Sequence, residues 1–302
     1  MHSITCAGSI SIDTTRTPFG KGERVLGGAA SYFSLSSSYF APTFICGVVG
    51  EDFPEEYEDL LSERADISSI RKIKGGKTFH FDSTFSYDLY HRQANKTELN
   101  VMADFEPILS ERAKESEFMY LATMLPSKQL AALKQAKNPK LVFMDTMDYY
   151  IERWPDELKE AVSKVHGIIL NDEEARMIAG ERNLMKCGRK ILSMGPRIAV
   201  IKKSEHGSLL FFGDKMIPFP AFPLEDIVDP TGAGDSFAGG FIGSLARDGA
   251  ISPTISQLKS AMAYANVMGS LVVRAFSADR VVHSSVAEIE KLYLEYRELL
   301  RL

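Results

Sequence analysis

The sequence predicts an α/β fold built on a mostly parallel central sheet with helices on both faces. Short apolar runs rich in β-branched residues alternate with longer segments in which apolar residues recur at helical spacing, a pattern typical of parallel sheets. The chain has 302 residues, of which 45% are hydrophobic and 25% are charged. These values are ordinary for a globular protein. No repeat or low-complexity linker interrupts the pattern, so we expect a single domain over residues 1–302.

The order of elements follows from local patterns along the chain. An apolar, β-rich run over 4–9 leads to Asp13, and a polar, turn-rich stretch over 14–24 follows it. Gly27 and Gly28 are expected to open a helix that ends at Ser38. Further strands are expected at 43–49, 118–122, 141–144, 167–170, 198–202 and 208–212. Further helices are expected at 53–65, 127–136, 155–165, 172–179, 257–273 and 286–300.

One segment, 72–101, departs from this rhythm. Within it Phe79, Phe81, Phe85 and Tyr87 alternate with polar residues. A period of two is typical of antiparallel strands with one covered face. We therefore expect a β excursion from an otherwise α/β chain.

The composition excludes several classes of protein. Lys and Arg total 35 against 40 Asp and Glu, so a net charge of -5 offers no excess of cations for binding nucleic acid. Cys6, Cys46 and Cys187 are widely spaced, which argues against a disulfide scaffold or a zinc ribbon. No apolar run approaches the ~20 residues of a membrane helix, and the N-terminus does not resemble a signal peptide. We expect a cytoplasmic protein that binds neither nucleic acid nor membrane.

The most informative stretch runs from Asp229 to Gly243 and reads DPTGAGDSFAGGFIG. Gly232 and Gly234 permit a close backbone approach that a Cβ atom would hinder. Apolar residues at helical spacing follow, so the turn leads into a helix N-terminus whose free N–H groups favour an anion. The turn lies too late in the chain for a dinucleotide-binding fingerprint, and GxxxxGK[ST] is absent.

Asp235 lies in the first turn of that expected helix, where a carboxylate would repel a bound phosphate. One explanation is structural, because Asp is favoured near helix starts. The other is functional, because phosphoryl transfer to an alcohol needs a base aimed at the hydroxyl group and donors for the developing charge. The residues alone leave both explanations open.

The stretch from Asp229 onward resembles the C-terminal signature of the ribokinase-like (PfkB) carbohydrate kinases. Four other pieces occur in the order of that family. Residues 27–30 (GGAA) resemble its double-glycine motif, and 47–53 (GVVGEDF) resemble its vGxDxfG region. Residues 171–174 (NDEE) match NxxE, and 200–207 (VIKKSEHG) resemble the strand and turn beside the nucleotide. The resemblance covers nearly the whole chain and implies a three-layer ribokinase-like fold with a small β-sheet lid.

The resemblance also implies the residues of the acceptor site. Asp235 would be the general base that takes the proton from a substrate hydroxyl group. The anion hole for the transferring phosphoryl group would be formed by the amides of Gly232, Ala233 and Gly234. Asp13 would bind two sugar hydroxyl groups, although a role as a turn residue stays open. Gly27 and Gly28 would let a helix N-terminus approach the substrate.

On the nucleotide side, the resemblance implies that Asn171 and Glu174 organise Mg²⁺ and phosphate, with Glu174 acting through water. Mg²⁺ keeps several waters and uses few carboxylates, so this sparse set is chemically reasonable. A helix N-cap is the structural alternative for Asn171. Lys202, Gly207 and Asn266 are candidates for the nucleotide pocket, and a merely solvated side chain is the alternative for Lys202.

The resemblance implies two further features. Asp229 and the Thr231 carbonyl group fall where many members of the family bind a monovalent cation, which would be K⁺. The lid would be formed by about 14–25 and 73–101, and it would exclude water and protect ATP from hydrolysis. Lids in this family often pair, so we expect a homodimer through the lid.

Several positions depart from the family pattern. Tyr32 stands where an asparagine usually contacts substrate, and Met147 and Tyr149 replace the asparagine and arginine of a DxNxR region. Ser204 replaces a glycine of the nucleotide turn, and residues 272–277 contain less glycine than the usual adenine loop. The base and the anion-hole turn are intact, so the departures concern substrate identity.

The sequence therefore predicts an ATP- and Mg²⁺-dependent phosphotransferase that acts on a hydroxyl group of a sugar or a sugar-like small molecule. A nucleoside kinase on the same fold is one alternative, because the lid aromatics Phe79, Phe81, Phe85 and Tyr87 could stack on a base. They could equally pack the lid against a second copy of the chain. A catalytically silent nucleotide-binding relative is another alternative. A nicotinamide dehydrogenase is disfavoured by the late glycine motif.

Overall fold

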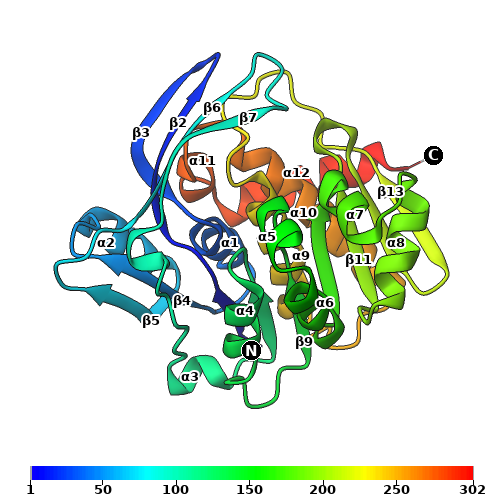
Figure 1. Ribbon diagram of the computed structural model, residues 1–302. Coiled ribbons are helices and arrows are strands. Elements are labelled where there is room, and N and C mark those ends of the chain that lie inside the picture. Colours follow the sequence, from blue (N-terminus) through cyan, green and yellow to red (C-terminus); the bar gives the residue numbers. More distant parts are fainter. Residues whose placement is uncertain (1, 302) are drawn as a thin grey trace.

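The large sheet organises the molecule (Figure 1). The computed structural model describes residues 2–301. The strands of this sheet are β1 (Ile4–Ala7), β4 (Thr43–Gly50), β5 (Asp66–Ile73), β8 (Phe118–Leu121), β9 (Leu141–Met144), β10 (Gly167–Asn171), β11 (Ile198–Lys202), β12 (Ser208–Phe212) and β13 (Lys215–Phe219). Their order is β13-β12-β11-β10-β9-β8-β1-β4-β5. Pairing is parallel from β5 to β11, and β12 and β13 add an antiparallel edge.

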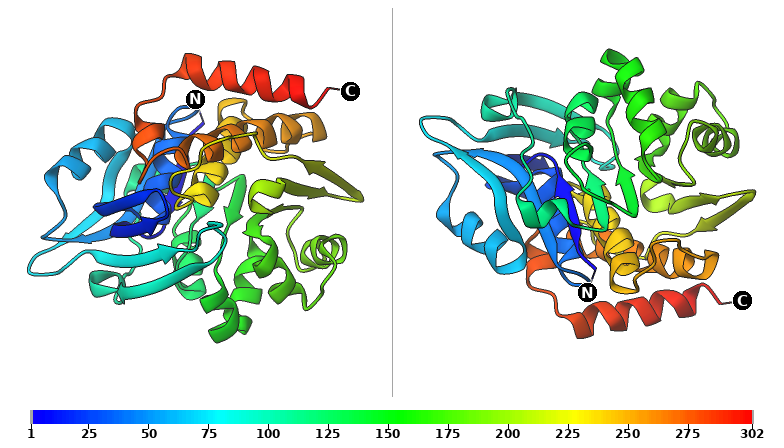
Figure 2. Two further views of the ribbon diagram at one scale, coloured as in Figure 1. Left: turned by 90° about the horizontal axis from the view of Figure 1, so that it is seen from above. Right: turned by 90° about the horizontal axis from the view of Figure 1, so that it is seen from below.

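Helices cover both faces of this sheet, so the predicted three-layer architecture is confirmed (Figure 2). One face packs against α1 (Ala29–Ser37), α2 (Glu55–Arg64), α9 (Ala233–Arg247), α10 (Ile255–Val272), α11 (Asp279–Val282) and α12 (Val286–Leu299). The other face packs against α3 (Glu111–Lys114), α4 (Pro126–Leu133), α5 (Asp148–Arg153), α6 (Pro155–Lys164), α7 (Asp172–Ala179) and α8 (Leu184–Ser193). Two short 3₁₀ turns are η1 (Asn100–Met102) and η2 (Ser204–His206).

Strand β8 shows why its sequence is apolar throughout. Phe118 and Tyr120 face the core that contains α9 and α10, whereas Met119 and Leu121 face the opposite core. Successive side chains of a strand point to opposite faces, so a strand covered on both sides has no polar position. The same continuous apolar pattern marks β9, and both strands were predicted from it.

A separate four-stranded sheet stands beside the large one (Figure 1). Its strands are β2 (Ser11–Thr17), β3 (Gly20–Gly27), β6 (Phe79–Phe85) and β7 (Arg92–Glu98), in the order β3-β2-β6-β7. The β2–β3 and β6–β7 pairs are antiparallel, and β2 and β6 are parallel with Asp13 opposite Phe81. The predicted β excursion is thus present, and it pairs with a second hairpin from the N-terminal region.

The prediction for the first strand was wrong at its end. Strand β1 ends at Ala7, and Asp13 is the third residue of β2 in the small sheet. Residues 8–10 between the two strands are also buried, so the apolar pattern carries no sign of where the chain leaves one sheet for the other. The stretch over 14–24, predicted to be rich in turns, consists mainly of strand residues of the β2–β3 hairpin.

The elements that were not predicted include the strands β5 and β13 and the helices α3, α5, α8 and α11. Strand β13 contains Pro218, which argues against a strand interior but is tolerated at a sheet edge, where β13 lies. Strand β5 is the opposite edge strand and has only one fully buried residue, so it lacks a continuous apolar run. Helix α8 contains Gly188, a poor helix former, which allows it to pack closely on Phe211.

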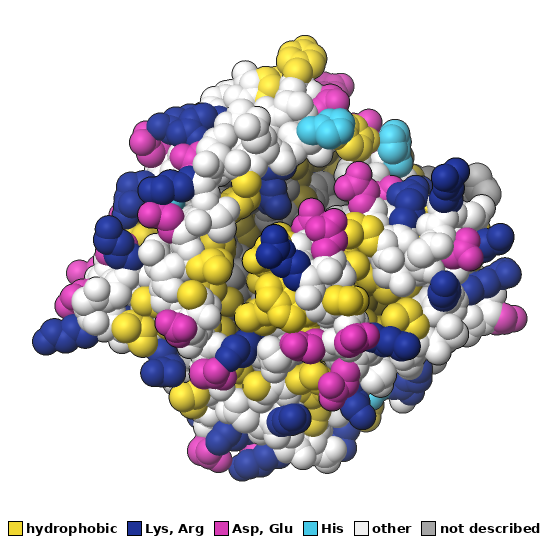
Figure 3. All heavy atoms as spheres, in the orientation of Figure 1, with side chains coloured by type: hydrophobic (Ala, Val, Ile, Leu, Met, Phe, Trp, Pro, Cys, Tyr) yellow, Lys and Arg dark blue, Asp and Glu magenta, His cyan; other side chains and the backbone are white. Residues whose placement is uncertain are grey.

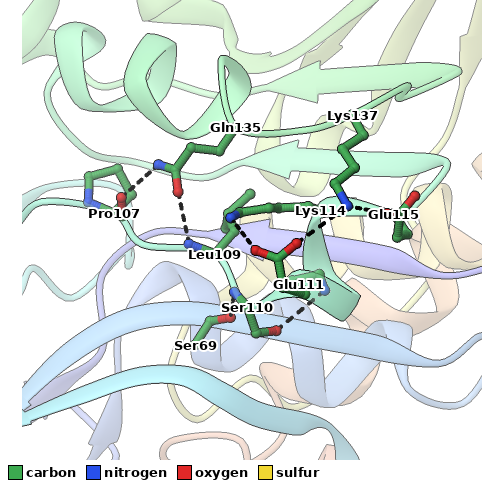
Figure 4. A network of polar contacts seen from close by, with 10 residues as sticks. Ser69, Pro107, Leu109, Ser110, Glu111, Lys114, Glu115, Gln135 and Lys137 are labelled. Atoms are coloured by element: carbon green, nitrogen blue, oxygen red, sulfur yellow. Dashed lines mark hydrogen bonds and ion pairs between the residues drawn. The ribbon is translucent and has the colours of Figure 1, made fainter.

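A polar network fastens the loop before α3 to neighbouring elements (Figure 4). The Gln135 side chain accepts a hydrogen bond from the Leu109 amide at 3.0 Å and donates one to the Pro107 carbonyl oxygen at 2.7 Å. The Ser110 amide donates to Ser69 Oγ at 2.8 Å. Helix α3 lies at the opposite end of the molecule from the β6–β7 hairpin (Figure 1), so we interpret this network as structural. Within residues 2–301, no helix is long and apolar enough to span a bilayer.

Candidate active site

The predicted site residues gather at the carboxyl ends of the parallel strands. Asp145 directly follows β9, Asn171 is the last residue of β10, and Lys202 is the last residue of β11. Carboxyl ends of parallel strands meet at one edge, where open α/β sheets bind their ligands. The turn at Gly232–Asp235 and helix α9 meet the same edge, because Lys202 Nζ lies beside Gly234.

The glycine turn has the close approaches that its composition predicts. Gly232 caps α9 in a left-handed conformation (φ 77°), and a Cβ atom there would lie 2.4 Å from the Tyr32 ring. A Cβ atom on Gly234 would lie 2.6 Å from Lys202 Nζ. The Ala233 amide donates to the Pro230 carbonyl oxygen at 3.2 Å. Within residues 2–301, the amides of Gly232 and Gly234 have no such acceptor, so they remain available to an anion.

Asp235 is the third residue of α9 and does not cap this helix. The N-cap of α9 is Gly232, without a side-chain hydrogen bond, and no described donor reaches the Asp235 carboxylate. Burial, and then the negative charge of Asp145, raise the pKa of Asp235 to about 7, while Lys202 opposes this shift. A carboxyl group with a pKa near 7 and no hydrogen-bond partner is suited to accept a proton.

Asp145, which was not predicted as a site residue, lies among the charged groups of Glu174, Lys202 and Asp235. It is 5% exposed, and its carboxylate accepts hydrogen bonds from Tyr120 Oη at 3.1 Å and Thr123 Oγ1 at 2.9 Å. Burial raises the pKa of Asp145, and the charge of Lys202 opposes the rise. Its position directly after a buried strand was the signal that could have identified it.

Asn171 and Glu174 form a reciprocal capping box at the start of α7. Asn171 Oδ1 accepts from the Glu174 amide at 2.8 Å, and Glu174 Oε2 accepts from the Asn171 amide at 2.8 Å. The structural alternative for Asn171 is therefore present in the structure. Only one Glu174 oxygen is used in this way, so the other is left for a ligand. Burial, and then the Asp145 charge, raise the pKa of Glu174.

A large cavity of about 790 Å³ lies beside these groups. Asn171, Lys202, Gly207, Gly234 and Asn266 all line it, together with the apolar side chains of Phe222, Phe237 and Val273. The volume and the mostly apolar lining with a few polar groups are typical of a small-molecule site. Of the residues predicted for the nucleotide side, Asn171, Lys202, Gly207 and Asn266 therefore share one cavity, whereas Glu174 does not line it.

Gly207 and Asn266 shape this large cavity in different ways. Gly207 has a positive φ of 80°, and a Cβ atom there would lie 2.0 Å from the Phe219 carbonyl oxygen. The turn after η2 therefore requires glycine. The Asn266 Nδ2 group donates to the Met262 carbonyl oxygen at 2.8 Å within α10.

Asp13 lies on the inner side of the small sheet and packs against Gly27. A Cβ atom on Gly27 would lie 2.1 Å from Asp13 Oδ2. Asp13 is 5% exposed, its Oδ1 atom has no partner among the described residues, and burial raises its pKa to about 6. Gly28 caps α1, and the next two amides of that helix already donate to Ser9. This turn therefore allows close packing and does not offer free amides to a ligand.

Tyr32 is buried against the glycine turn, and its hydroxyl group has no partner among residues 2–301. Burial and three nearby carboxylates raise the pKa of Tyr32 well above its ordinary value. The carboxylates are Asp13, Asp229 and Asp235. The hydroxyl group therefore stays protonated and can donate a hydrogen bond. A buried polar atom without a partner costs about 1–3 kcal/mol, so it points to a ligand.

Two further features complete this side of the site. The Arg92 guanidinium on β7 lies 5.0 Å from the centroid of the Phe81 ring. Its positive charge opposes the rise that burial causes in the pKa of Asp13 and of Asp235. No sequence pattern identifies Arg92, because alternation predicts that it lies on a strand but not that it lies near a site. Asp229 Oδ1 accepts from the Thr231 amide at 2.9 Å, whereas Asp229 Oδ2 and Thr231 Oγ1 are buried without a described partner.

Comparison with known proteins identifies the family. The model of the pfkB family of carbohydrate kinases matches residues 1–284. The chain belongs to this family. A cytidine kinase of Thermococcus kodakarensis is 32% identical over 257 residues, which cover 82% of this chain and 90% of that protein. A nucleoside kinase of Methanothermobacter thermautotrophicus is 28% identical over 266 residues, covering 86% of this chain and 82% of that protein.

Solved structures of family members share the fold. The nucleoside kinase of Methanocaldococcus jannaschii superposes with a TM-score of 0.77 at 18% identity, covering 98% of this chain and 99% of that chain. A ribokinase of Arabidopsis thaliana, solved with ribose and ATP, superposes with a TM-score of 0.75 at 18% identity, covering 97% and 98%. The ribokinase-like fold is therefore confirmed, and the chain is a sugar or nucleoside kinase of the pfkB family.

Proposed function

We propose that this protein transfers the γ-phosphate of ATP to a hydroxyl group of a nucleoside, with Asp235 as the general base. The observation that carries this proposal is the Asp235 carboxyl group, which has a pKa of about 7 and lies beside a glycine turn with free amides. Asp235 takes the proton of the acceptor hydroxyl group as its oxygen attacks the γ-phosphorus. ADP leaves as the bond from the γ-phosphorus to the β–γ bridging oxygen breaks.

The large cavity and the turn fit a bound nucleotide. The amides of Gly232 and Gly234 are free at the N-terminus of α9, which favours an anion there, and Lys202 brings a positive charge to the same turn. A Cβ atom at Gly234 would collide with Lys202 Nζ, so glycine lets the lysine amine lie against the turn. Asn266 and the apolar wall of the cavity are placed to hold the base and ribose of ATP.

The residues also fit Mg²⁺ held mainly by phosphate oxygens and water. Glu174 keeps one carboxylate oxygen outside its capping box, close to Lys202 and Asp145. Within residues 2–301, no group of three or more metal-binding side chains is gathered at one place, and Mg²⁺ in phosphate sites does not need one. When bound, Mg²⁺ neutralises phosphate charge during transfer.

A nucleoside acceptor is favoured by the register of the small sheet. Asp13, which we propose to bind the ribose hydroxyl groups, lies directly opposite Phe81 in the β2–β6 pair. The Phe81 ring, with the Arg92 guanidinium above it, provides a stacking surface within reach of a base attached to that ribose. The similarity to a cytidine kinase and to a nucleoside kinase supports this choice over a free sugar.

Two other family features are proposed for this chain. Asp229 and Thr231 have buried oxygens without described partners, which fits a bound monovalent cation such as K⁺. The small sheet is proposed to act as the lid over the acceptor. Strands β3 and β7 are its edge strands, each paired on one side within this sheet, so a second copy of the chain could dock there to form a homodimer.

The test is an assay of phosphorylated product, with ATP and Mg²⁺, across nucleosides, pentoses, hexoses and cyclitols. We expect a nucleoside to give the highest kcat/KM. Asp235→Asn should lower kcat at least about a hundredfold while ATP binding is retained, because the base is lost. A free sugar as the best acceptor would overturn the substrate class. Near wild-type turnover by Asp235→Asn would overturn the proposed base.

A further inference from the structure

The tip of the β6–β7 hairpin is a well-ordered turn rather than a loose loop. The Ser86 amide donates to the His91 carbonyl oxygen at 2.9 Å, and the His91 amide returns a bond to Ser86 Oγ at 3.0 Å. Asp88 Oδ1 accepts from the Tyr90 amide at 3.1 Å, and Leu89 adopts a left-handed conformation (φ 60°). These bonds fix the direction in which the side chains of the tip project.

This tip reaches across the molecule to the large cavity. Asp88, Leu89 and Tyr90 line that cavity, together with Asn171 and Lys202 of the large sheet. The space-filling view shows histidine and hydrophobic side chains close together at the upper rim of the hollow (Figure 3). The small sheet therefore supplies residues on both sides of the site, with Asp13 at the acceptor and the hairpin tip at the cavity.

Tyr90 makes the contact between the small sheet and the turn η2 at the large cavity. Its ring lies 6.3 Å from the ring of His206, centroid to centroid, at an interplanar angle of 31°. Burial, and then the Glu205 carboxylate, raise the pKa of Tyr90, so its hydroxyl group stays protonated beside η2. Tyr87, on the same tip, is 88% exposed and does not line the cavity, whereas Tyr90 is 45% exposed.

We propose that Tyr90, although it belongs to the small sheet, is a binding residue for the donor nucleotide and closes the large cavity over it together with His206. This inference rests on the proposed function, because it takes ATP as the occupant of the cavity. A protonated phenol and an imidazole ring at the rim can donate hydrogen bonds to ribose or phosphate oxygens. An aromatic ring held over the cavity also excludes water from the bound phosphates.

The position of Tyr90 couples the binding of the nucleotide to the binding of the acceptor. Asp13 and Tyr90 are carried by the same four-stranded sheet, so a nucleotide that holds Tyr90 also holds the sheet over the acceptor. Binding of one substrate then favours binding of the other, because both substrates hold the same sheet in one position. Loss of Tyr90 should therefore weaken ATP binding directly and should reduce the coupling between the two substrates.

The experiment measures the Kd of Mg²⁺-ATP by calorimetric titration of the whole chain, without acceptor, for wild type, Tyr90→Ala and Tyr87→Ala. We expect Tyr90→Ala to raise the Kd about tenfold, the size of effect typical for loss of one aromatic contact with its hydrogen bond. Tyr87→Ala should leave the Kd unchanged. The melting temperature of each variant shows whether it is folded, and both side chains are exposed enough for folding to survive.

A second arm of the experiment tests His206, the residue whose ring lies against Tyr90. His206→Ala should also raise the Kd. The binding free energy lost by the Tyr90→Ala/His206→Ala double variant should not exceed the sum of the losses in the two single variants. An unchanged Kd in Tyr90→Ala would overturn the inference and leave the proposed function standing. Failure of wild type to bind ATP would overturn both. A rise in the acceptor KM alone would assign Tyr90 to the acceptor side and would also overturn the inference.

Discussion

Gly234→Ala should separate stability from activity at the glycine turn. A Cβ atom at this position would lie 2.6 Å from Lys202 Nζ, whereas ordinary contact begins at 3.4 Å. The lysine amine must therefore retreat by at least about 0.8 Å, which it can do because it is the end of a flexible side chain. The methyl group would also occupy the space in which the proposed phosphoryl group lies. The amide at this position is kept, but the displaced Lys202 amine no longer reaches the transferring group. Loss of one donor to a developing anion costs about 10²–10³ in rate, so we expect kcat to fall at least about a hundredfold.

The Gly234→Ala substitution should not lower the free energy of unfolding. Gly234 lies in the first turn of α9, where alanine is the better helix former by up to about 1 kcal/mol. Steady-state kinetics at saturating ATP and thermal unfolding of wild type and Gly234→Ala provide the assay. A Gly234→Ala enzyme with wild-type kcat would refute the proposed role of this turn.

Two further predictions concern the groups around the base. Asp145→Asn removes a negative charge that raises the pKa of Asp235, so the acidic limb of kcat/KM, expected at about pH 7 in wild type, should move to lower pH. Asp148→Asn is the control that should not move this limb, and an unmoved limb in Asp145→Asn would contradict the electrostatic argument. Tyr32→Phe should raise the acceptor KM about tenfold while the free energy of unfolding stays equal or increases by about 1 kcal/mol, because a buried unpartnered hydroxyl group is removed. An unchanged acceptor KM in Tyr32→Phe would show that its hydroxyl group does not contact the substrate.

The fold could be predicted where local pattern and tertiary environment agree. Strands β8 and β9 are buried on both faces, so their continuous apolar sequences identify them. The passage from β1 to β2 could not be located, because residues 8–10 are buried as deeply as the strands on either side. Strand β13 was missed because Pro218 argues against a strand everywhere except at an edge, and sequence alone does not show which strand is the edge.

Some residues of the candidate site could be predicted from the sequence, and others could not. Asn171, Lys202, Gly207, Gly234 and Asn266 were proposed from motifs, and the structure brings them to one cavity. A motif indicates the residues that share a local turn or a strand end. Contacts between distant elements follow only from the packing of the small sheet on the large one.

Three residues show what that packing adds. Arg92, Tyr90 and Tyr32 were not assigned to the site from sequence, because their positions depend on how distant elements meet. Tyr32 was noted only as a departure from a pattern, and its unpartnered hydroxyl group became visible with the glycine turn packed against its ring. Interactions of this kind carry no local sequence signal.

Asp235 is proposed to be the base for phosphorylation of an acceptor hydroxyl group. The most direct measurement is the single-turnover rate of phosphorylated nucleoside formation by wild type and Asp235→Asn, with each enzyme saturated with Mg²⁺-ATP. We predict that product forms with wild type in a pH-dependent step with a midpoint near pH 7, and that Asp235→Asn binds ATP but forms product at least about a hundredfold more slowly. Equal rates for the two enzymes would contradict the claim.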